Sequence, residues 1–208
     1  MAANVTAVIP GDDYQITRVR WGGSLLEEAW LKGSPKLMTV APHVVTAVEA
    51  DAVGEAAVQS FTPTLDENDL RVRVTDRVQP ESDKVTLAEA RVVVSGGRGV
   101  GSAEGFAVLE ELAELLGGAV GGSRVATNLG WRPHAEQVGQ TGTRVAPDLY
   151  IACGISGAIQ HWVGCKGSKH ILTINTDSES PMVAKADYAV IGDLHEVLPA
   201  LIEEIRKL

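Results

Sequence analysis

Aromatic side chains are scarce in this sequence, because phenylalanine, tryptophan and tyrosine together make up 4% of its 208 residues. Proteins that bind single-stranded nucleic acid stack bases on aromatic rings, so this scarcity disfavours that class. Positive charge is also in short supply, since 18 lysine and arginine residues face 27 aspartate and glutamate residues, for a formal net charge of -9. We therefore expect no nucleic-acid partner and no attraction to an anionic membrane.

Cysteine is nearly absent, with only Cys153 and Cys165 in the chain. Two thiols without metal-ligand spacing predict neither a disulfide scaffold nor a zinc site, and they favour a reducing compartment. No apolar run approaches the ~20 residues of a membrane span. The first residues lack the basic segment and the apolar core of a signal peptide. We expect a soluble, cytoplasmic protein with no inserted segment.

Residues 1–78 show strand patterns with little helix between them. Leu25–Leu31 fits either a strand or a short helix, and the sequence does not decide between them. The strand candidates are Val5–Ile9, Tyr14–Trp21, Lys36–Ala41, Ala56–Phe61 and Leu70–Val78. Such a series does not make a doubly wound sheet alone, so we expect part of a sheet to be missing here or to be supplied by a partner.

The second half of the chain alternates strand and helix patterns. Gln79–Lys84 is polar and contains proline, which predicts a linker over residues 79–87. Beyond it, the alternation predicts an α/β fold with a Rossmann-like parallel sheet over residues 88–208. The expected strands are Arg91–Ser95, a short one within Ala119–Ala126, Leu149–Cys153, His170–Ile174 and Tyr188–Ile191. The expected helices run from Glu104 or Gly105 to Leu116, over a short segment with Gln160 and His161, and from Asp193 to Leu208.

A glycine-rich turn follows the first of these strands, in the order SGGRGVG. It fails as a Walker A motif because Ser102 stands where the lysine should be. It is also an imperfect dinucleotide fingerprint, because Ser102 again replaces the third glycine and no acidic residue follows at the expected distance. The turn alone leaves a phosphate cradle and a structural connection open. Arg98 within it favours phosphate.

The segment Gly154-Ile155-Ser156-Gly157 follows a buried strand, at the end where open α/β sheets bind ligands. Small residues there let a ligand approach backbone N–H groups. With Ala158 the segment also resembles a nucleophile elbow. His161 is on roughly the wrong side of the same helix to act as the general base for Ser156. A serine hydrolase stays open as an alternative, because His195 with an aspartate such as Asp177 or Asp187 could supply the other two groups.

Several further residues carry weak signals one at a time. Arg124 is either a surface arginine or a cation over a planar ring. Thr141 and Asn175 are either turn formers or ligand contacts, and His161 is either a satisfied core histidine or a ligand contact. All of them follow predicted parallel strands at the carboxyl end. Their joint placement predicts one extended ligand across the sheet edge.

The segments VVVSGGRG, GGSR, QVGQTG, APDLYIACGISGAIQH and INTD, in this order and at these spacings, resemble the alpha subunit of the electron transfer flavoprotein. The resemblance covers residues 88–208, which correspond to that family's FAD-binding domain. YQITRVRWGGS and KLMTVAP are similar, more loosely, to the last part of its N-terminal domain. Residues 1–78 would then be a remnant of that domain, in a fragment or a shortened relative.

The resemblance implies that the chain binds FAD, and it implies a role for each matched residue. Arg98 and Ser123 match positions near the phosphates and sugars, and Arg124 matches an arginine against the isoalloxazine. Thr141 would lie near N5 and His161 near O2, so that these two and Arg124 tune the potential. The full implied contact set is Arg98, Ser123, Arg124, Val138, Gly139, Gln140, Thr141, Ser156, Gly157, Ala158, Ile159, Gln160, His161, Asn175, Asp193 and Leu194.

The implied function is that of a one-electron carrier and needs no catalytic nucleophile, because the cofactor carries the chemistry. Implied partners are the flavoprotein's beta subunit in a heterodimer, flavin dehydrogenases such as the acyl-CoA dehydrogenases of fatty acid beta-oxidation, and a quinone oxidoreductase. The implied compartment is the bacterial cytoplasm, or the mitochondrial matrix in a eukaryote. The alternatives are an NADP-type nucleotide-binding module and a regulatory protein of the same fold.

Overall fold

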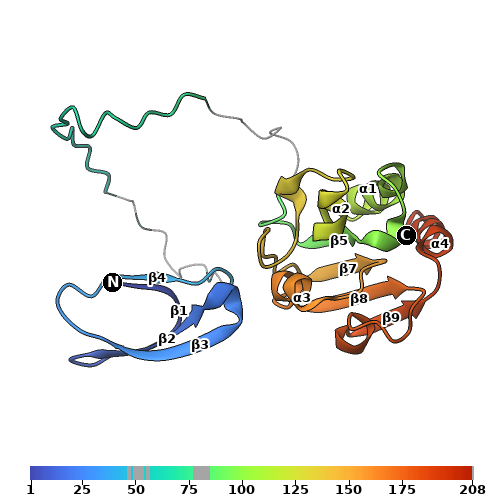
Figure 1. The fold of residues 1–208 in the computed structure, drawn as a ribbon, viewed down its shortest axis with the longest axis horizontal. Helices are drawn as coiled ribbons and strands as arrows, with labels where there is room; N and C mark the ends of the chain where they lie inside the picture. Colours follow the sequence, from blue (N-terminus) through green and yellow to red (C-terminus); the bar gives the residue numbers. More distant parts are fainter. Residues whose placement is uncertain (46–47, 49–53, 55–56, 77–84, 208) are drawn as a thin grey trace. The chain divides into compact units, whose positions relative to one another are not determined.

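The computed structural model describes residues 1–45, 48, 54, 57–76 and 85–207 (Figure 1). The first part is a four-stranded mixed sheet in the order β3-β2-β1-β4. Its strands are β1 (Ala2–Ile9), β2 (Tyr14–Arg20), β3 (Leu25–Leu31) and β4 (Met38–Val40). Leu25–Leu31, which the sequence left undecided, is therefore a strand. It pairs antiparallel with β2 over its whole length.

Two strands expected after this sheet are not formed in the described residues. Residues 57–61 and 70–76 contain no strand, so both predictions are wrong there, and the rest of each falls outside the described residues, as does the linker segment 79–84. The apolar side chains that suggested strands, Val58, Phe61, Val72 and Val74, are all exposed. A strand gains its stability from a paired neighbour and a buried face, and neither is found for these segments.

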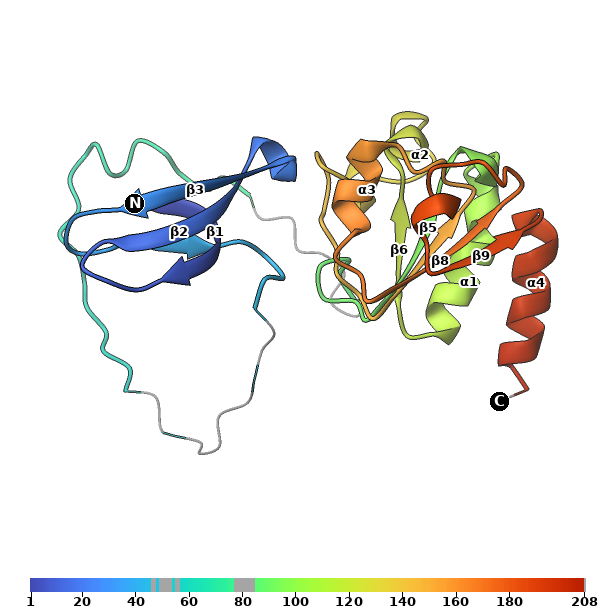
Figure 2. The same cartoon turned by 90° about the horizontal axis from the view of Figure 1, so that it is seen from below.

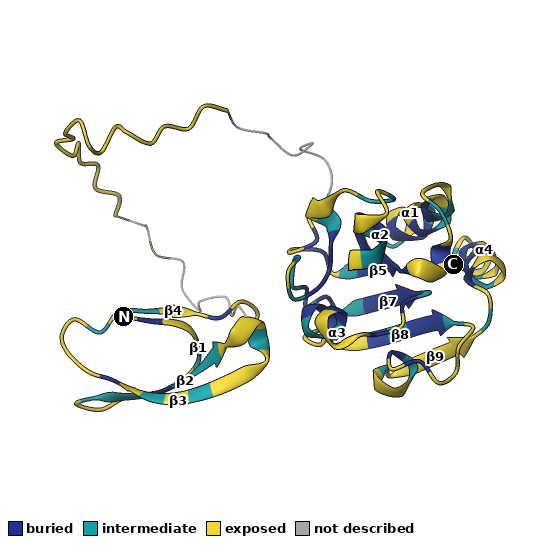
Figure 3. Cartoon of the chain, in the orientation of Figure 1, coloured by how far each residue is buried: buried dark blue, intermediate teal, exposed yellow. Residues whose placement is uncertain are grey.

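The second half is a five-stranded sheet in the order β6-β5-β7-β8-β9. Every pair in it is parallel, as predicted. The strands are β5 (Val92–Gly96), β6 (Ala119–Gly122), β7 (Leu149–Cys153), β8 (His170–Asn175) and β9 (Tyr188–Ile191). The central strands β5 and β7 are almost wholly buried, as Figure 3 shows, which explains their largely apolar sequences.

Helices cover both faces of this sheet (Figure 2). On one face, α1 (Ala107–Leu115) and α4 (Leu194–Ile205) pack on each other and on the strands through a core that includes Leu109 and Leu198. On the other face, α3 (Ile159–Cys165) lies over Tyr150 and its neighbours in a second apolar cluster. Burying each large apolar side chain stabilises the fold by about 1.5–3 kcal/mol.

The short strand predicted within Ala119–Ala126 is confirmed. It ends at Gly122, and α2 (Arg124–Asn128), which was not predicted, begins immediately after Ser123. The Ser123 hydroxyl accepts a hydrogen bond from the Ala126 N–H at 3.3 Å and so caps this helix. A cap of this kind turns the chain at the sheet edge and places Ser123 and Arg124 at the carboxyl end of β6.

Both thiols are completely buried, and burial raises the pKa of Cys153 and of Cys165 to about 12. Since the thiolate is the reactive form, we expect neither cysteine to react with Ellman's reagent at pH 8 in the native chain. Both should react promptly in denaturant, which is the control. Rapid labelling of the native protein would contradict the packing described above.

Candidate functional site

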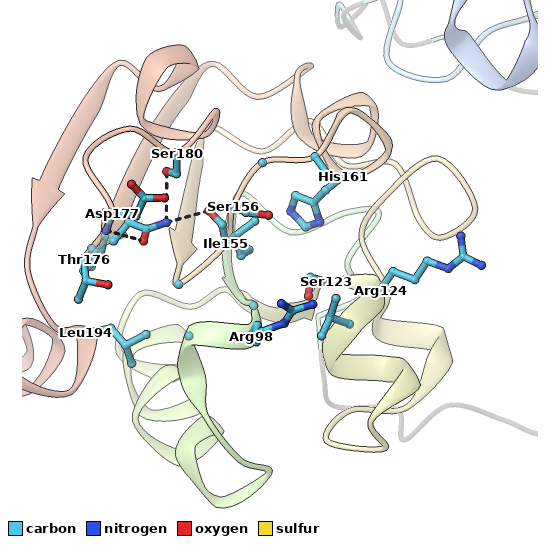
Figure 4. Close-up of a pocket in the computed structure, with 18 of the residues that line it drawn as sticks. Arg98, Ser123, Arg124, Ile155, Ser156, His161, Thr176, Asp177, Ser180 and Leu194 are labelled. Atoms are coloured by element: carbon cyan, nitrogen blue, oxygen red, sulfur yellow. Dashed lines mark hydrogen bonds between the residues drawn. The ribbon is translucent and has the colours of Figure 1, made fainter.

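The topology creates a switch point between β5 and β7. The chain leaves β5 toward β6 on one side and continues from β7 toward β8 on the other, and open α/β sheets bind ligands at such points. A cavity of about 690 Å³ lies there. Residues that follow all five strands line it, from Gly97 after β5 to Asp193 after β9 (Figure 4). The predicted extended site at the carboxyl edge is thus a single continuous cavity.

Two glycine turns make contact at the floor of this cavity. The Gly97 N–H donates to the Cys153 carbonyl at 2.9 Å, and the Gly99 N–H donates to the Gly154 carbonyl at 3.0 Å. A β-carbon on Gly97 would meet the Gly154 oxygen at 2.3 Å, and one on Gly99 would meet the Gly154 α-carbon at 2.7 Å. Only residues without side chains permit this approach of one backbone to the other.

The turn after β7 offers free donors to the cavity. Among the described residues, the backbone N–H groups of Ser156, Gly157 and Ala158 have no hydrogen-bond partner. Consecutive N–H groups in a turn form an anion-binding concavity. Arg98 lies across from them, with its side chain beside Ser123 in Figure 4. Together these groups fit a phosphate or a pyrophosphate.

His161 lines the cavity and is 7% exposed. Its Nε2 lies 2.7 Å from the Tyr150 hydroxyl, whereas its Nδ1 is buried and has no hydrogen-bond partner in the described part of the chain. Burial lowers the pKa of His161 to about 4, which the Val138 backbone opposes in part. The imidazole is therefore neutral at pH 7.

Asn175 connects two of the loops that form the cavity. Its side-chain amide donates to the Ile155 carbonyl at 3.0 Å and to the Ser180 hydroxyl at 3.3 Å, and its oxygen accepts from the Asp177 N–H at 3.1 Å. These bonds, dashed in Figure 4, fasten the turn after β7 to the loop after β8. The amide group of Asn175 is thus committed to holding the wall in place.

Most of the residues singled out from the sequence line this one cavity. They are Arg98, Ser123, Arg124, Ser156, Gly157, Ala158, Gln160, His161, Asn175, Asp193 and Leu194. Arg124 is exposed, and its side chain extends away from the other labelled residues in Figure 4. Ile159 and the run Val138–Thr141 do not line it. That run adjoins the start of α3, because the Gln140 N–H donates to the Gln160 carbonyl at 2.7 Å.

A buried glutamine supports this neighbouring loop. Gln137 is 1% exposed, accepts from the Thr127 hydroxyl at 2.9 Å and donates to the Thr141 hydroxyl oxygen at 3.0 Å. The Thr141 hydroxyl thereby keeps its own proton for another acceptor. Gln137 was not among the residues singled out from the sequence, although it directly precedes the VGQTG motif.

Other residues of the cavity were not predicted as ligand contacts, although Asp177 and His195 were considered as hydrolase partners. Thr176, Asp177 and Ser180 belong to the loop after β8, Gly192 precedes Asp193, and His195 lies in the first turn of α4. Their position after a predicted parallel strand was the one available indication. The hydrolase alternative gains nothing from this geometry, because within the described residues neither His161 nor His195 is hydrogen-bonded to Ser156.

The parallel sheet and the cavity at its switch point define a nucleotide-binding domain of the Rossmann type. Comparison with known proteins identifies the family. Residues 86–166 match the family model described as the electron transfer flavoprotein FAD-binding domain. The chain is thus confirmed as a relative of the electron transfer flavoprotein alpha subunits, with FAD as the cofactor of the matched domain. These comparisons do not favour the NADP-type alternative.

Three curated relatives illustrate the similarity. Protein FixB of Clostridium saccharobutylicum is 42% identical over 212 residues, which span 100% of this chain and 63% of that protein. The electron transfer flavoprotein subunit alpha of Bacillus subtilis is 44% identical over 96% of this chain and 61% of its own length. The electron transfer flavoprotein subunit alpha of Mycobacterium leprae is 46% identical over 89% of this chain and 58% of its own length. This chain therefore spans about three fifths of the relatives that it matches.

The described residues contain no helix long and apolar enough to cross a membrane.

The contact between the two glycine turns can be tested with a matched pair of variants. Gly97 has a φ of -111°, which alanine tolerates, so Gly97→Ala acts only through its steric clash with Gly154. We expect it to destabilise the protein by about 1–3 kcal/mol in urea denaturation and to weaken FAD binding. Gly122→Ala is the control, since its β-carbon would meet nothing closer than 3.5 Å. Equal stability of the two variants would show that the turns can separate freely.

Proposed function

We propose that this chain is the FAD-binding portion of an electron transfer flavoprotein, a carrier of single electrons between flavin dehydrogenases and a quinone oxidoreductase. One observation carries the proposal: a cavity at the carboxyl ends of five parallel strands, formed in large part by the segment that matches the FAD-binding domain. FAD supplies the electron-carrying chemistry when it is bound. The side chains around it bind, orient and tune, and none is required as a nucleophile.

The phosphate end of the proposed site is the turn from Ser156 to Ala158 together with Arg98 and Ser123. Its support is the row of unpaired N–H groups and the guanidinium across from them. We propose that Asn175, Asp193 and Leu194 form the adenosine side. Asp193 caps α4 by accepting from the His195 N–H at 2.9 Å, so that its position is fixed before any ligand arrives.

The end of the proposed site that would hold the isoalloxazine ring includes Arg124, Thr141 and His161. His161 would act as a neutral hydrogen-bonding group and not as a cation, because burial lowers the pKa of its imidazole to about 4. Thr141 would donate the proton that its bond from Gln137 leaves free. Arg124 would contribute positive charge from its exposed position. We propose that Val138, Gly139, Gln140, Ile159 and Gln160 complete this end.

We propose a heterodimer with the flavoprotein's beta subunit, and an electron supply from flavin dehydrogenases such as the acyl-CoA dehydrogenases of fatty acid beta-oxidation. The support is that the relatives are named as alpha subunits of electron transfer flavoproteins, and this chain spans only a part of each. The compartment proposed is the bacterial cytoplasm, or the mitochondrial matrix in a eukaryote. Residues 1–78 are proposed as part of the family's N-terminal domain, 79–87 as the linker and 88–208 as the FAD-binding domain.

The proposed function predicts that the purified chain retains FAD through desalting and shows a flavin absorbance spectrum. Free FAD at 100 times its Kd should raise the free energy of unfolding by about 2.7 kcal/mol, which thermal denaturation with and without FAD measures. NADP⁺ at the same concentration is the control and should change stability far less. A chain that stays colourless and is not stabilised by FAD would overturn the proposal. Stabilisation by NADP⁺ alone would favour the NADP-type nucleotide-binding module.

Substitution of His161 tests the ring end of the site. His161→Ala removes the imidazole that the proposal places beside the isoalloxazine, and we expect the midpoint potential of bound FAD to fall. A hydrogen bond to a charged group contributes about 1.5–3 kcal/mol, which is roughly 60–130 mV for one electron. A dithionite titration measures the shift. His195→Ala, which alters a histidine of the same cavity at the adenosine side, should leave the potential within roughly 20 mV of the unsubstituted chain.

A further inference from the structure

The turn after β7 is held through four consecutive backbone carbonyls, each of which accepts a hydrogen bond from another part of the chain. The first two accept from the glycine turn after β5. The loop after β8 holds the other two. The Ile155 carbonyl accepts from the Asn175 side chain at 3.0 Å, and the Ser156 carbonyl accepts from the Met182 N–H at 3.1 Å. In the described chain, Asn175 is therefore the only side chain that holds a carbonyl of this turn.

A hydrogen bond to one of these carbonyls also fixes the N–H group of the next residue. The peptide bonds of the turn are trans, so each C=O and the N–H that follows it lie in one rigid plane and point in opposite directions. The bond from Asn175 to the Ile155 carbonyl therefore directs the Ser156 N–H away from Asn175. Ser156 lines the cavity, and its N–H has no partner among the residues that the structure describes. The direction of this free donor is thus set by Asn175.

The amide group of Asn175 has its polar atoms engaged within the protein. One proton of its nitrogen is donated to the Ile155 carbonyl and the other to the hydroxyl of the buried Ser180, and these bonds are dashed in Figure 4. Its oxygen accepts from the Asp177 N–H. A backbone carbonyl can only accept and a backbone N–H can only donate, so these partners admit one orientation of the amide. A side chain with both donors engaged acts on a ligand through the groups that it holds in place.

We propose that Asn175 is a positioning residue for the phosphates: its bond to the Ile155 carbonyl holds the Ser156 N–H in the direction in which that group donates to a phosphate oxygen. This inference rests on the proposed function, in which the turn from Ser156 to Ala158 binds the phosphates of FAD. Asn175 stands on the adenosine side of the proposed site, yet it acts on the phosphate end. Without its bond, the peptide plane between Ile155 and Ser156 is free to rotate. Binding then has to order this donor, which lowers the affinity.

Two ligands distinguish this role from a direct contact with adenosine. Inorganic pyrophosphate carries phosphates but no adenosine, and FAD carries both. Titration of the full ¹⁵N-labelled chain, followed by ¹H–¹⁵N spectra, gives the Kd for pyrophosphate and identifies the amide signals that move, and calorimetry gives the Kd for FAD. We expect pyrophosphate to shift the Ser156 and Gly157 signals. Asn175→Ala should weaken the binding of both ligands by the same factor, roughly tenfold in Kd. Loss of an adenosine contact would weaken the binding of FAD alone.

Thr173→Val is the matched control. Thr173 lies two residues earlier on β8, outside the residues that line the cavity, and its hydroxyl donates to the Ala152 carbonyl of β7 at 3.3 Å. The substitution therefore removes a bond from a side chain to the backbone between the same two strands, without touching the carbonyls of the turn. It should lower the stability of the chain and leave both Kd values unchanged. Equal losses of affinity in the two variants would show that Asn175 has only a general structural role.

The unsubstituted chain decides the matter even if Asn175→Ala does not fold. A crystal structure of that chain with FAD should keep the bond from Asn175 to the Ile155 carbonyl and show the Ser156 N–H on a phosphate oxygen. An Asn175 amide turned to the adenosine would overturn the positioning role. Pyrophosphate that leaves the Ser156 signal unmoved, or that binds Asn175→Ala as tightly as the unsubstituted chain, would also overturn it. Failure of every chain to bind FAD, with pyrophosphate binding weakened as expected, would instead refute the proposed function alone.

Discussion

The contact between the turns after β5 and β7 is the constraint on which the site depends. Gly97 and Gly99 donate backbone hydrogen bonds to the carbonyls of Cys153 and Gly154, at a separation that leaves no room for a β-carbon. The turn that follows, from Ser156 to Ala158, lines the cavity, and its backbone N–H groups have no partner among the described residues. The glycine contact thus fixes the start of the turn that contains these donors.

A second layer of polar groups fixes the orientation of what lines the cavity. Asn175 fastens two loops together, Gln137 accepts from Thr127 and donates to Thr141, and Tyr150 bonds to His161. The bond from Gln137 leaves the hydroxyl proton of Thr141 free for another acceptor, and Thr141 itself is exposed. The bonds of Asn175 and Tyr150 are instead buried or half-buried, so they hold the cavity wall in one arrangement.

The repetitive features of the sequence predicted the fold, and the exceptions follow from tertiary pairing. Leu149–Cys153 and Tyr188–Ile191 are strands at the expected bounds, because central and edge strands alike are short apolar runs between turns. Residues 57–61 and 70–76 have similar patterns but no paired strand within the part of the chain that the structure describes, and a local pattern cannot reveal this. Arg98, Ser156 and His161 were found because glycine motifs mark turns. Tyr150 was not, since a buried tyrosine in an apolar run looks like core until its hydroxyl is seen to meet a histidine.

In this site the charged side chains lie at exposed positions, and the buried part of the wall contains a neutral hydrogen-bonding side chain. The arginines stand at exposed positions, Arg98 in the turn after β5 and Arg124 at the start of α2, where water reduces the cost of their charge. The buried wall contains His161 instead, which burial keeps neutral. A buried cation would have to be desolvated whether or not the cofactor carried negative charge. The arrangement with both guanidinium groups at exposed positions and a neutral imidazole in the buried wall avoids that cost, because no ionised group has to be kept out of water in the empty site.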